Sequence, residues 1–324
     1  MSVVHPLCSF FGHHKCATQW IKSVLVDICE LTNLRLFEVS RIDESGFASL
    51  RDLLDCFRPD VLVYSNADIT RIREAGHLRG FHVVRDPRDL IVSAYFSHLH
   101  SHPLDTWRGL AEHRHRLRSL GKTEGLLLEM EFSRRVLEEM RDWDYSSPDV
   151  LEIRMEDLVE APELHFARVI EHVGLTSLPD VTRTERLSSA VHIVLSRIRR
   201  RARGLISHRL RASDGDCDLH ERVAARWWGG KDPYRLYPLD SVWARGLRLR
   251  NFPMDHLPAI VERHRFSTKA DRRNRGHEDP RHHYRKGIAG DWRNHFNEVH
   301  IEAFRRRHND VLLKLGYETD PHWT

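Results

Sequence analysis

Three separated stretches of the chain combine cations, hydroxyls and small residues in a way that suits an anion. The first, at residues 10–20, reads FFGHHKCATQW. Gly12 lets the chain turn at the end of an apolar segment, and helical spacing begins at Ala17. The amides and dipole of a helix N-terminus attract anions, while Lys15 adds a positive charge and Thr18 a hydroxyl. The stretch predicts a phosphate-binding loop, although a plain strand–helix turn with a surface lysine has the same pattern.

The second stretch, VVRDPRDLIVSAYFSH at residues 83–98, joins a strand pattern to a helix pattern. Arg85 ends the strand, and Ser93 lies in the following helix where it could reach the same end of a sheet. A guanidinium fork and a hydroxyl would hold a second phosphate. The alternative is that Arg85 pairs with Asp86 or Asp89 in an exposed ion pair that contributes about 0–1 kcal/mol.

The third stretch, HYRKGIAGDWRNHF at residues 283–296, places Arg285 and Lys286 directly before Gly287, with Gly290 close behind. Glycines at this spacing allow the backbone to approach a ligand closely. Taken alone, such a basic loop is usually just a solvated surface segment.

Strand and helix patterns alternate around these stretches. Strands are expected at residues 6–12, 34–39, 61–65, 80–86 and 150–156, and helices at 17–31, 48–57, 88–102, 105–120, 123–142, 162–174, 252–266 and 298–315. This alternation predicts an α/β fold, a single domain in which helices flank a central parallel sheet. Ligands of such open sheets bind at the carboxyl ends of the strands, which is where the phosphate-binding stretches are expected to meet.

Composition narrows the class of protein. No run approaches the 18 apolar residues of a membrane span, and no signal peptide is visible. The five cysteines have no paired spacing, which argues against a disulfide framework or a zinc site and favours a reducing cytoplasm. Only seven of the 51 Lys and Arg residues are lysines, and there are 24 histidines, so a lone Arg or His is a weak signal.

Residues 179–251 differ in character from the rest. Residues 192–211 (HIVLSRIRRRARGLISHRLR) mix apolar and basic positions, and Trp227, Trp228 and Trp243 follow. We expect a mostly helical, Arg- and Trp-rich insertion that separates 1–178 from 252–324. It could pack over the ligand site, contact a substrate or subunit, or touch an anionic membrane surface through 192–211. No nucleic-acid-binding module is visible, so a nucleic-acid partner is not expected.

Taken together, the three stretches resemble one family, the sulfotransferases of the cytosolic and bacterial type that use 3′-phosphoadenosine 5′-phosphosulfate (PAPS). Lys15 to Trp20 is similar to the family's K-S-G-T-T-W, and Arg85 to Ser93 matches R-[ND]-P-[KR]-D-x-x-x-S. The pattern R-K-G-x-x-G-D-W-[KR]-N-x-F is matched in full from Arg285 to Phe296. The resemblance covers roughly residues 5–178 and 252–320, in the family's order.

The resemblance implies a P-loop-like fold and a PAPS site. The first stretch would bind the 5′-phosphosulfate, the second the 3′-phosphate, and the third would close over the nucleotide. Lys15 would stabilise the phosphate that leaves as adenosine 3′,5′-bisphosphate (PAP) in an in-line displacement, and no metal is implied. The implied cofactor-binding residues are Lys15, Cys16, Ala17, Thr18, Gln19, Trp20, Arg85, Ser93, Arg285, Lys286 and Gly287.

The sequence also departs from the family pattern. Ala17 stands where glycine is usual, and Asn66 falls where cytosolic members carry the histidine that acts as general base. His14, beside the loop lysine, is the first candidate for the base, with Glu38 second and Asp68 third. The family's dimerisation pattern is degraded near the C-terminus, which leaves the oligomeric state open.

Two other functions remain open at this point. An ATP-dependent P-loop kinase would need G-x-x-x-x-G-K-[ST], and this spacing is absent around Lys15. A PAPS-binding protein that has lost catalysis is the second alternative, motivated by Asn66. The acceptor, whether a small molecule, a sugar or a lipid-like compound with a hydroxyl or amine, is not specified by these motifs.

Overall fold

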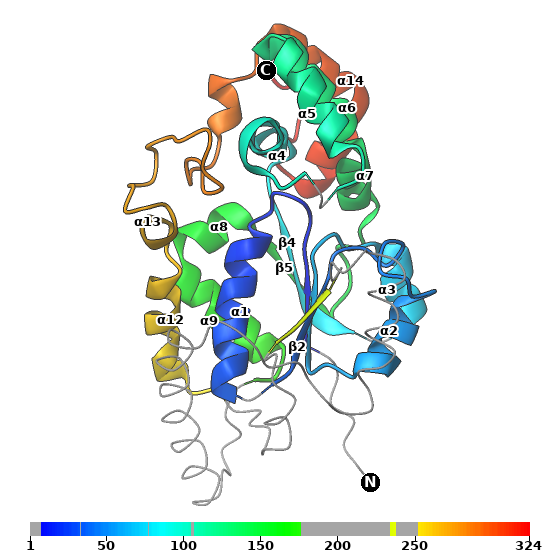
Figure 1. The fold of residues 1–324 in the computed structure, drawn as a ribbon, viewed down its shortest axis with the longest axis vertical. Helices are drawn as coiled ribbons and strands as arrows, with labels where there is room; N and C mark the ends of the chain where they lie inside the picture. Colours follow the sequence, from blue (N-terminus) through cyan, green and yellow to red (C-terminus); the bar gives the residue numbers. More distant parts are fainter. Residues whose placement is uncertain (1–7, 33, 77, 105–106, 176–233, 238–251) are drawn as a thin grey trace, which may run out of the picture.

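The computed structural model describes residues 8–32, 34–76, 78–104, 107–175, 234–237 and 252–324 (Figure 1). A six-stranded sheet has the order β5-β4-β1-β3-β2-β6. Its strands are β1 (Cys8–Phe11), β2 (Leu36–Val39), β3 (Val61–Tyr64), β4 (Arg79–Val84), β5 (Val150–Arg154) and β6 (Tyr234–Tyr237). Strands β1 to β5 pair in parallel, which confirms the predicted α/β fold with a central parallel sheet.

Strand β6 is the exception, because it pairs antiparallel with β2 at the edge of the sheet. It falls within 179–251, the segment for which a mostly helical insertion is expected. The remainder of that segment, including the basic stretch 192–211, lies outside the described residues. The expected division into 1–178 with 252–324 and a separate insertion therefore stays a prediction.

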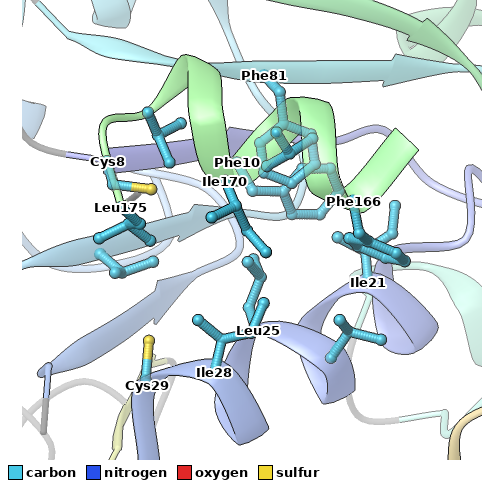
Figure 2. Close-up of a cluster of buried hydrophobic side chains, with 14 of the residues drawn as sticks. Cys8, Phe10, Ile21, Leu25, Ile28, Cys29, Phe81, Phe166, Ile170 and Leu175 are labelled. Carbon is cyan, nitrogen blue, oxygen red and sulfur yellow. The ribbon is translucent and has the colours of Figure 1, made fainter. Parts of the chain in front are cut away.

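Helices cover both faces of the sheet (Figure 1). On one face lie α1 (Thr18–Thr32), α8 (Met155–Glu160), α9 (Pro162–His172) and α12 (Leu257–Arg263), and on the other lie α2 (Leu50–Phe57) and α3 (Ile69–Ala75). Figure 2 shows the core beneath α1 and α9, where Phe10 and Phe81 of the sheet stack with ring centroids 4.9 Å apart. Ile21 and Phe166 close the same core from the two helices. This buried apolar contact holds the start of α1 at the carboxyl end of β1.

A group of helices lies beyond the carboxyl end of the sheet, at the top of Figure 1. It comprises α4 (Pro87–Phe96), α5 (Leu110–Ser119), α6 (Lys122–Phe132), α7 (Arg134–Asp142) and α14 (Glu298–Leu315). The predicted helix at 88–102 changes type, because α4 is followed by the π-helix η1 (Ser97–Ser101). The amide of His102 donates to the carbonyl of Ser97, five residues earlier, at 2.7 Å. Such π turns redirect the side chains that follow them.

Other elements differ from expectation in local ways. The helix predicted at 123–142 is divided at Ser133, whose ψ of 2° is not helical. Helices α3 and α8 are additional, and β5 ends where α8 begins. The segment 252–266 forms η3 (Met254–His256) and α12, after which come α13 (Phe266–Lys269) and η4 (Asp291–Asn294).

Two further findings concern the part of the chain that the structure describes. None of the described helices is both long and apolar enough to cross a bilayer. No disulfide joins the cysteines that the structure describes, Cys8, Cys16, Cys29 and Cys56.

Candidate functional site

A cavity of about 1570 Å³ opens at the carboxyl edge of the parallel strands. The segments that follow β1, β2, β3 and β4 all contribute to its wall, with Lys15, Arg41, Asn66 and Arg85 among the lining residues. All of the residues expected to bind the cofactor line it except Cys16: Lys15, Ala17, Thr18, Gln19, Trp20, Arg85, Ser93, Arg285, Lys286 and Gly287. Three stretches far apart in the sequence therefore meet around one space.

Cys16 lies elsewhere. Its side chain is fully buried in the core beside α4, and its amide donates to the carbonyl of His13 at 3.2 Å. Burial raises the pKa of the thiol to about 12, so the sulfur is protonated near neutral pH. Cys16 shapes the loop through its backbone, and its side chain faces away from the cavity.

The loop between β1 and α1 is tightly folded. A Cβ on Gly12 would lie 2.9 Å from the Phe10 ring and 3.0 Å from Oγ1 of Thr18, so only glycine fits there. The Thr18 hydroxyl donates to the carbonyl of His13. Lys15 and Ala17 have φ angles of 65° and 60°, in the left-handed region that favours glycine. The helix begins directly after this turn, so its first amides, which have no partners within the helix, face the end of the loop.

The strain at Ala17 leads to a stability prediction. Ala17→Gly is expected to raise the free energy of unfolding by about 0.5–1 kcal/mol, because relief of the left-handed strain exceeds the entropy that glycine adds to the unfolded chain. Urea denaturation followed by circular dichroism measures the change. The matched control is Ala167→Gly inside α9, which should lower the free energy of unfolding by about 0.5–1 kcal/mol. A destabilised Ala17→Gly variant would contradict the strained geometry.

Two cations near the start of α1, Lys15 and Arg85, stand at the cavity without a carboxylate partner among the described residues. Arg85 is only 8% exposed, and its Nη1 donates to the carbonyl of Lys15 at 3.3 Å. Burial, followed by the charge of Arg85, lowers the pKa of Lys15 to about 8. The ion pair between Arg85 and Asp86 or Asp89 is not formed, since Asp86 binds Arg88 and Asp89 accepts backbone amides. Uncompensated cations this close together are stabilised by a bound anion.

The third stretch is tied to the second through Asp89. Its carboxylate accepts the amides of Gly290 at 2.6 Å and Trp292 at 2.8 Å, which fixes the C-terminal loop against α4. Gly287 has a φ of 70°, and a Cβ there would lie 2.6 Å from the ring of Phe266. The loop therefore needs glycine for both conformation and space.

The charges of this loop are arranged differently from those of Lys15 and Arg85. Arg285 and Lys286 both pair with Asp291, at 2.5 and 2.6 Å. Although burial raises the pKa of Asp291, hydrogen bonds from His295, Lys286 and other donors hold it far below the usual range. The two cations reach the cavity with their positive charge partly neutralised.

The structure separates the three candidates for the general base. His14 lines the cavity, and burial followed by the charges of His98 and Lys15 lowers its pKa well below the ordinary value, so its ring is neutral at pH 7. Glu38 also lines the cavity, but both its oxygens lie 3.0 Å from Nζ of Lys22. Asp68 caps α3 by accepting the amide of Thr70 and is not part of the wall. His14 is the candidate whose titratable group lies at the cavity outside an ion pair.

Several lining residues have no counterpart in the sequence argument. His102, Trp107 and His283 face the same space. The pKa of His102 is lowered to about 3 by burial and then by His98, and that of His283 to about 4 by burial and then by Lys15. His102 and Trp107 come from a loop with no recognisable motif, whereas His283 is the first residue of the third stretch. The dense run HLHSH at 98–102 is the sequence signal that could have identified His102.

One group of the described side chains has the spacing of metal ligands. The ligating atoms of His98, His113 and Glu129 lie within 4.8 Å of one another, and all three residues are buried. Each imidazole also lies 2.8–3.0 Å from the carboxylate of Glu129, which is hydrogen-bond distance. Hydrogen bonds among these side chains therefore account for their close spacing.

Comparisons with known proteins give the following. No family model and no curated protein matches the sequence. Among solved structures, the chain is similar to mouse sulfotransferase SULT7A1 complexed with PAP, with 13% identity and a TM-score of 0.43 over 95% of this chain and 84% of that one. It is also similar to retinol dehydratase in complex with androsterone and inactive cofactor PAP, with 12% identity and a TM-score of 0.43 over 95% and 81%. At these values the likeness assigns no function, which has to follow from the chain's own cavity.

Proposed function

We propose that the chain is a PAPS-dependent sulfotransferase that acts on a hydroxyl or amine of a small-molecule, sugar or lipid-like acceptor and releases PAP. The observation that carries the proposal is the pair of cations Lys15 and Arg85. They lie at the start of α1 without carboxylate partners among the described residues, and the loop of Arg285 and Lys286 meets them across one cavity. The order of these groups in the sequence is the order in which the sulfotransferases carry them.

The residues present fit an anionic nucleotide. Arg85 and Ser93 would hold the 3′-phosphate, and Lys15 with the first amides of α1 would hold the 5′-phosphate. Trp20 and Phe266 offer aromatic surface for the adenine on the same wall. When bound, PAPS supplies the sulfuryl group. Lys15 would stabilise the negative charge that develops on the departing phosphate, and His14 would accept the proton of the acceptor.

Both alternative functions find less support. The loop lacks the spacing of an ATP-binding P-loop, and Glu38 of the cavity wall is already paired with Lys22, which removes it as a ligand for magnesium. Catalysis would be lost if the histidine that Asn66 replaces were the only possible general base. Asn66 donates through its side-chain amide to Oγ of Ser40 at 2.9 Å and cannot accept a proton, but His14 lies at the same cavity.

Ligand-dependent thermal unfolding tests the proposal. PAP at a hundredfold excess over Kd should stabilise the protein by about 2.7 kcal/mol and raise Tm by a few degrees. Arg85→Gln should lose most of this shift. Arg79→Gln is the matched control, because Arg79 is exposed at the opposite end of the same strand β4 and should retain the shift.

Each outcome decides between the functions. A shift with PAP that is absent with ADP and Mg²⁺ supports the PAPS site and justifies an acceptor screen with labelled PAPS. A shift with ADP and Mg²⁺ but not with PAP would contradict the proposal and favour an ATP-dependent kinase. If Arg85→Gln and Arg79→Gln respond to PAP like the wild type, the nucleotide binds away from the cavity described above.

A further inference from the structure

A chain of buried polar groups leads away from the cavity behind His14. Nε2 of His14 lies 3.1 Å from Nε2 of His98, and Nδ1 of His98 lies 3.0 Å from both carboxylate oxygens of Glu129. His98 and Glu129 are both 0% exposed. Glu129 also accepts hydrogen bonds from Nε2 of His113 at 2.8 Å and from Oγ of Ser133 at 2.6 Å. Three side chains, those of His98, His113 and Ser133, thus converge on one buried carboxylate.

The direction of each hydrogen bond follows from the charge of Glu129. Burial raises the pKa of this carboxyl, but the two histidines hold it down at about 2, so it is ionised and can only accept. Nδ1 of His98 must therefore carry the proton that it donates. A His98 ring that carries only this one proton presents a bare Nε2 to His14, and Nε2 of His14 then donates to it. The remaining nitrogen of His14, Nδ1, is left with a free lone pair.

We propose that Glu129 and His98 are positioning residues that hold His14 as its Nε2–H tautomer and leave Nδ1 to take the proton of the acceptor. In the transfer that this chain is proposed to catalyse, the acceptor oxygen or nitrogen bonds to sulfur as the bond from sulfur to the bridging phosphate oxygen breaks. The acceptor proton goes to Nδ1 of His14, and the electron pair leaves with the phosphate beside Lys15. The inference rests on the proposed function for its catalytic consequence, whereas the tautomer is a property of the ligand-free protein.

The surroundings of His14 explain why it needs such support. The charged and titratable groups that face it are His98 and His102 from the η1 segment, Lys15 from its own loop and Arg41 from the segment after β2. Together with burial, these groups lower the pKa of His14 and so disfavour its imidazolium form. Glu129, reached through His98, is the carboxylate in this arrangement that stabilises the imidazolium when it forms.

The fold holds the ring of His14 in one orientation. It stacks on His98 with centroids 5.1 Å apart and meets the edges of His102 and Trp107 at 5.1 and 4.9 Å. His98 itself lies on the π-helix η1, directly after α4, and Glu129 projects from α6. The change from α- to π-helix at Ser97 therefore sets the orientation of the residue that links His14 to Glu129.

The tautomer of His14 can be measured in the full-length, ligand-free protein. Long-range ¹H–¹⁵N correlation spectra of histidine-labelled protein should show His14, assigned by its loss in His14→Gln, as the Nε2–H form. His98→Leu should leave a mixture of tautomers. His113→Leu is the matched control, because His113 is an equally buried partner of Glu129 but does not contact His14, and the wild-type tautomer should persist. If His14 is Nδ1–H in the wild type, the proposal is wrong, whether or not the variants fold.

Kinetics provide the second readout. His98→Leu and Glu129→Gln should lower kcat for PAP release from PAPS, with the acceptor found in the screen, by about 10- to 100-fold while the KM for PAPS stays within threefold. His113→Leu should change kcat by less than threefold. In a His14→Ala background, Glu129→Gln should cause no further loss, since its effect passes through His14. An additive loss would assign Glu129 a purely structural role.

These results separate this inference from the proposed function. A fixed Nε2–H tautomer together with no PAP binding would overturn the sulfotransferase and leave the positioning chain standing. PAP binding that depends on Arg85, combined with a His14 tautomer that does not respond to His98→Leu, would overturn the positioning chain and leave the sulfotransferase standing.

Discussion

Replacing Lys15 with methionine is expected to lower kcat for PAP release by about 10³-fold or more, a loss of at least about 4 kcal/mol of transition-state stabilisation. Methionine keeps an unbranched apolar stem but removes the charge that faces the departing phosphate. Steady-state release of PAP from PAPS measures the effect. The control is Lys122→Met at the exposed start of α6, which should leave kcat unchanged. Near-normal turnover of Lys15→Met would exclude the mechanism.

The lowered pKa of Lys15 gives the same residue a signature in binding. Lysine attracts phosphate only while protonated, and in the free protein its pKa is about 8. Bound PAP favours the protonated form, so the Kd for PAP should increase between pH 7 and pH 9. The increase should reach about tenfold, because roughly a tenth of the free protein keeps the charge at pH 9. Calorimetric titrations at both pH values should show this increase in the wild type and a weak, pH-independent Kd in Lys15→Met.

The fold could be predicted because its signals are local. Short apolar runs alternate with amphipathic helix patterns. This alternation alone predicts a parallel sheet with its ligand at the carboxyl edge. The same alternation predicts the loop that contains Lys15 and places Arg85 at the end of a strand. The antiparallel pairing of β6 with β2 did not, because it joins residues about two hundred positions apart whose pairing leaves no local pattern.

The surroundings of the cavity were less predictable for a similar reason. The link from His14 through His98 to Glu129 depends on a π-helical turn and on the packing of α4 against α6, and nothing near His14 in the sequence encodes either. The conformation of Ala17 also escaped prediction, since helical spacing begins at that residue while its backbone is still left-handed. The sequence placed Glu38 second and Asp68 third as candidates for the base, but it could not reveal their partners Lys22 and Thr70.

His14→Ala is expected to lower kcat by about 10²–10⁴-fold, the range that a general base contributes. A base works only while unprotonated, and the pKa of His14 is lowered by burial and by the neighbouring cations. The wild-type activity should therefore stay level through neutral pH and fall only at pH values below the ordinary histidine pKa of about 6.5. The pH profile of kcat/KM for His14→Ala should lack this acidic fall.

The other two candidates provide the comparison. Asp68→Ala should cost α3 about 1 kcal/mol of stability through its lost N-cap yet change kcat by less than threefold, because its carboxylate lies outside the cavity wall. Glu38→Gln removes a carboxylate that already neutralises Lys22, so its effect on kcat should be far smaller than that of His14→Ala. If His14→Ala changes kcat by less than threefold while Glu38→Gln lowers it a hundredfold, the proton goes to Glu38. The Lys22 pair would then be the group that opens during turnover.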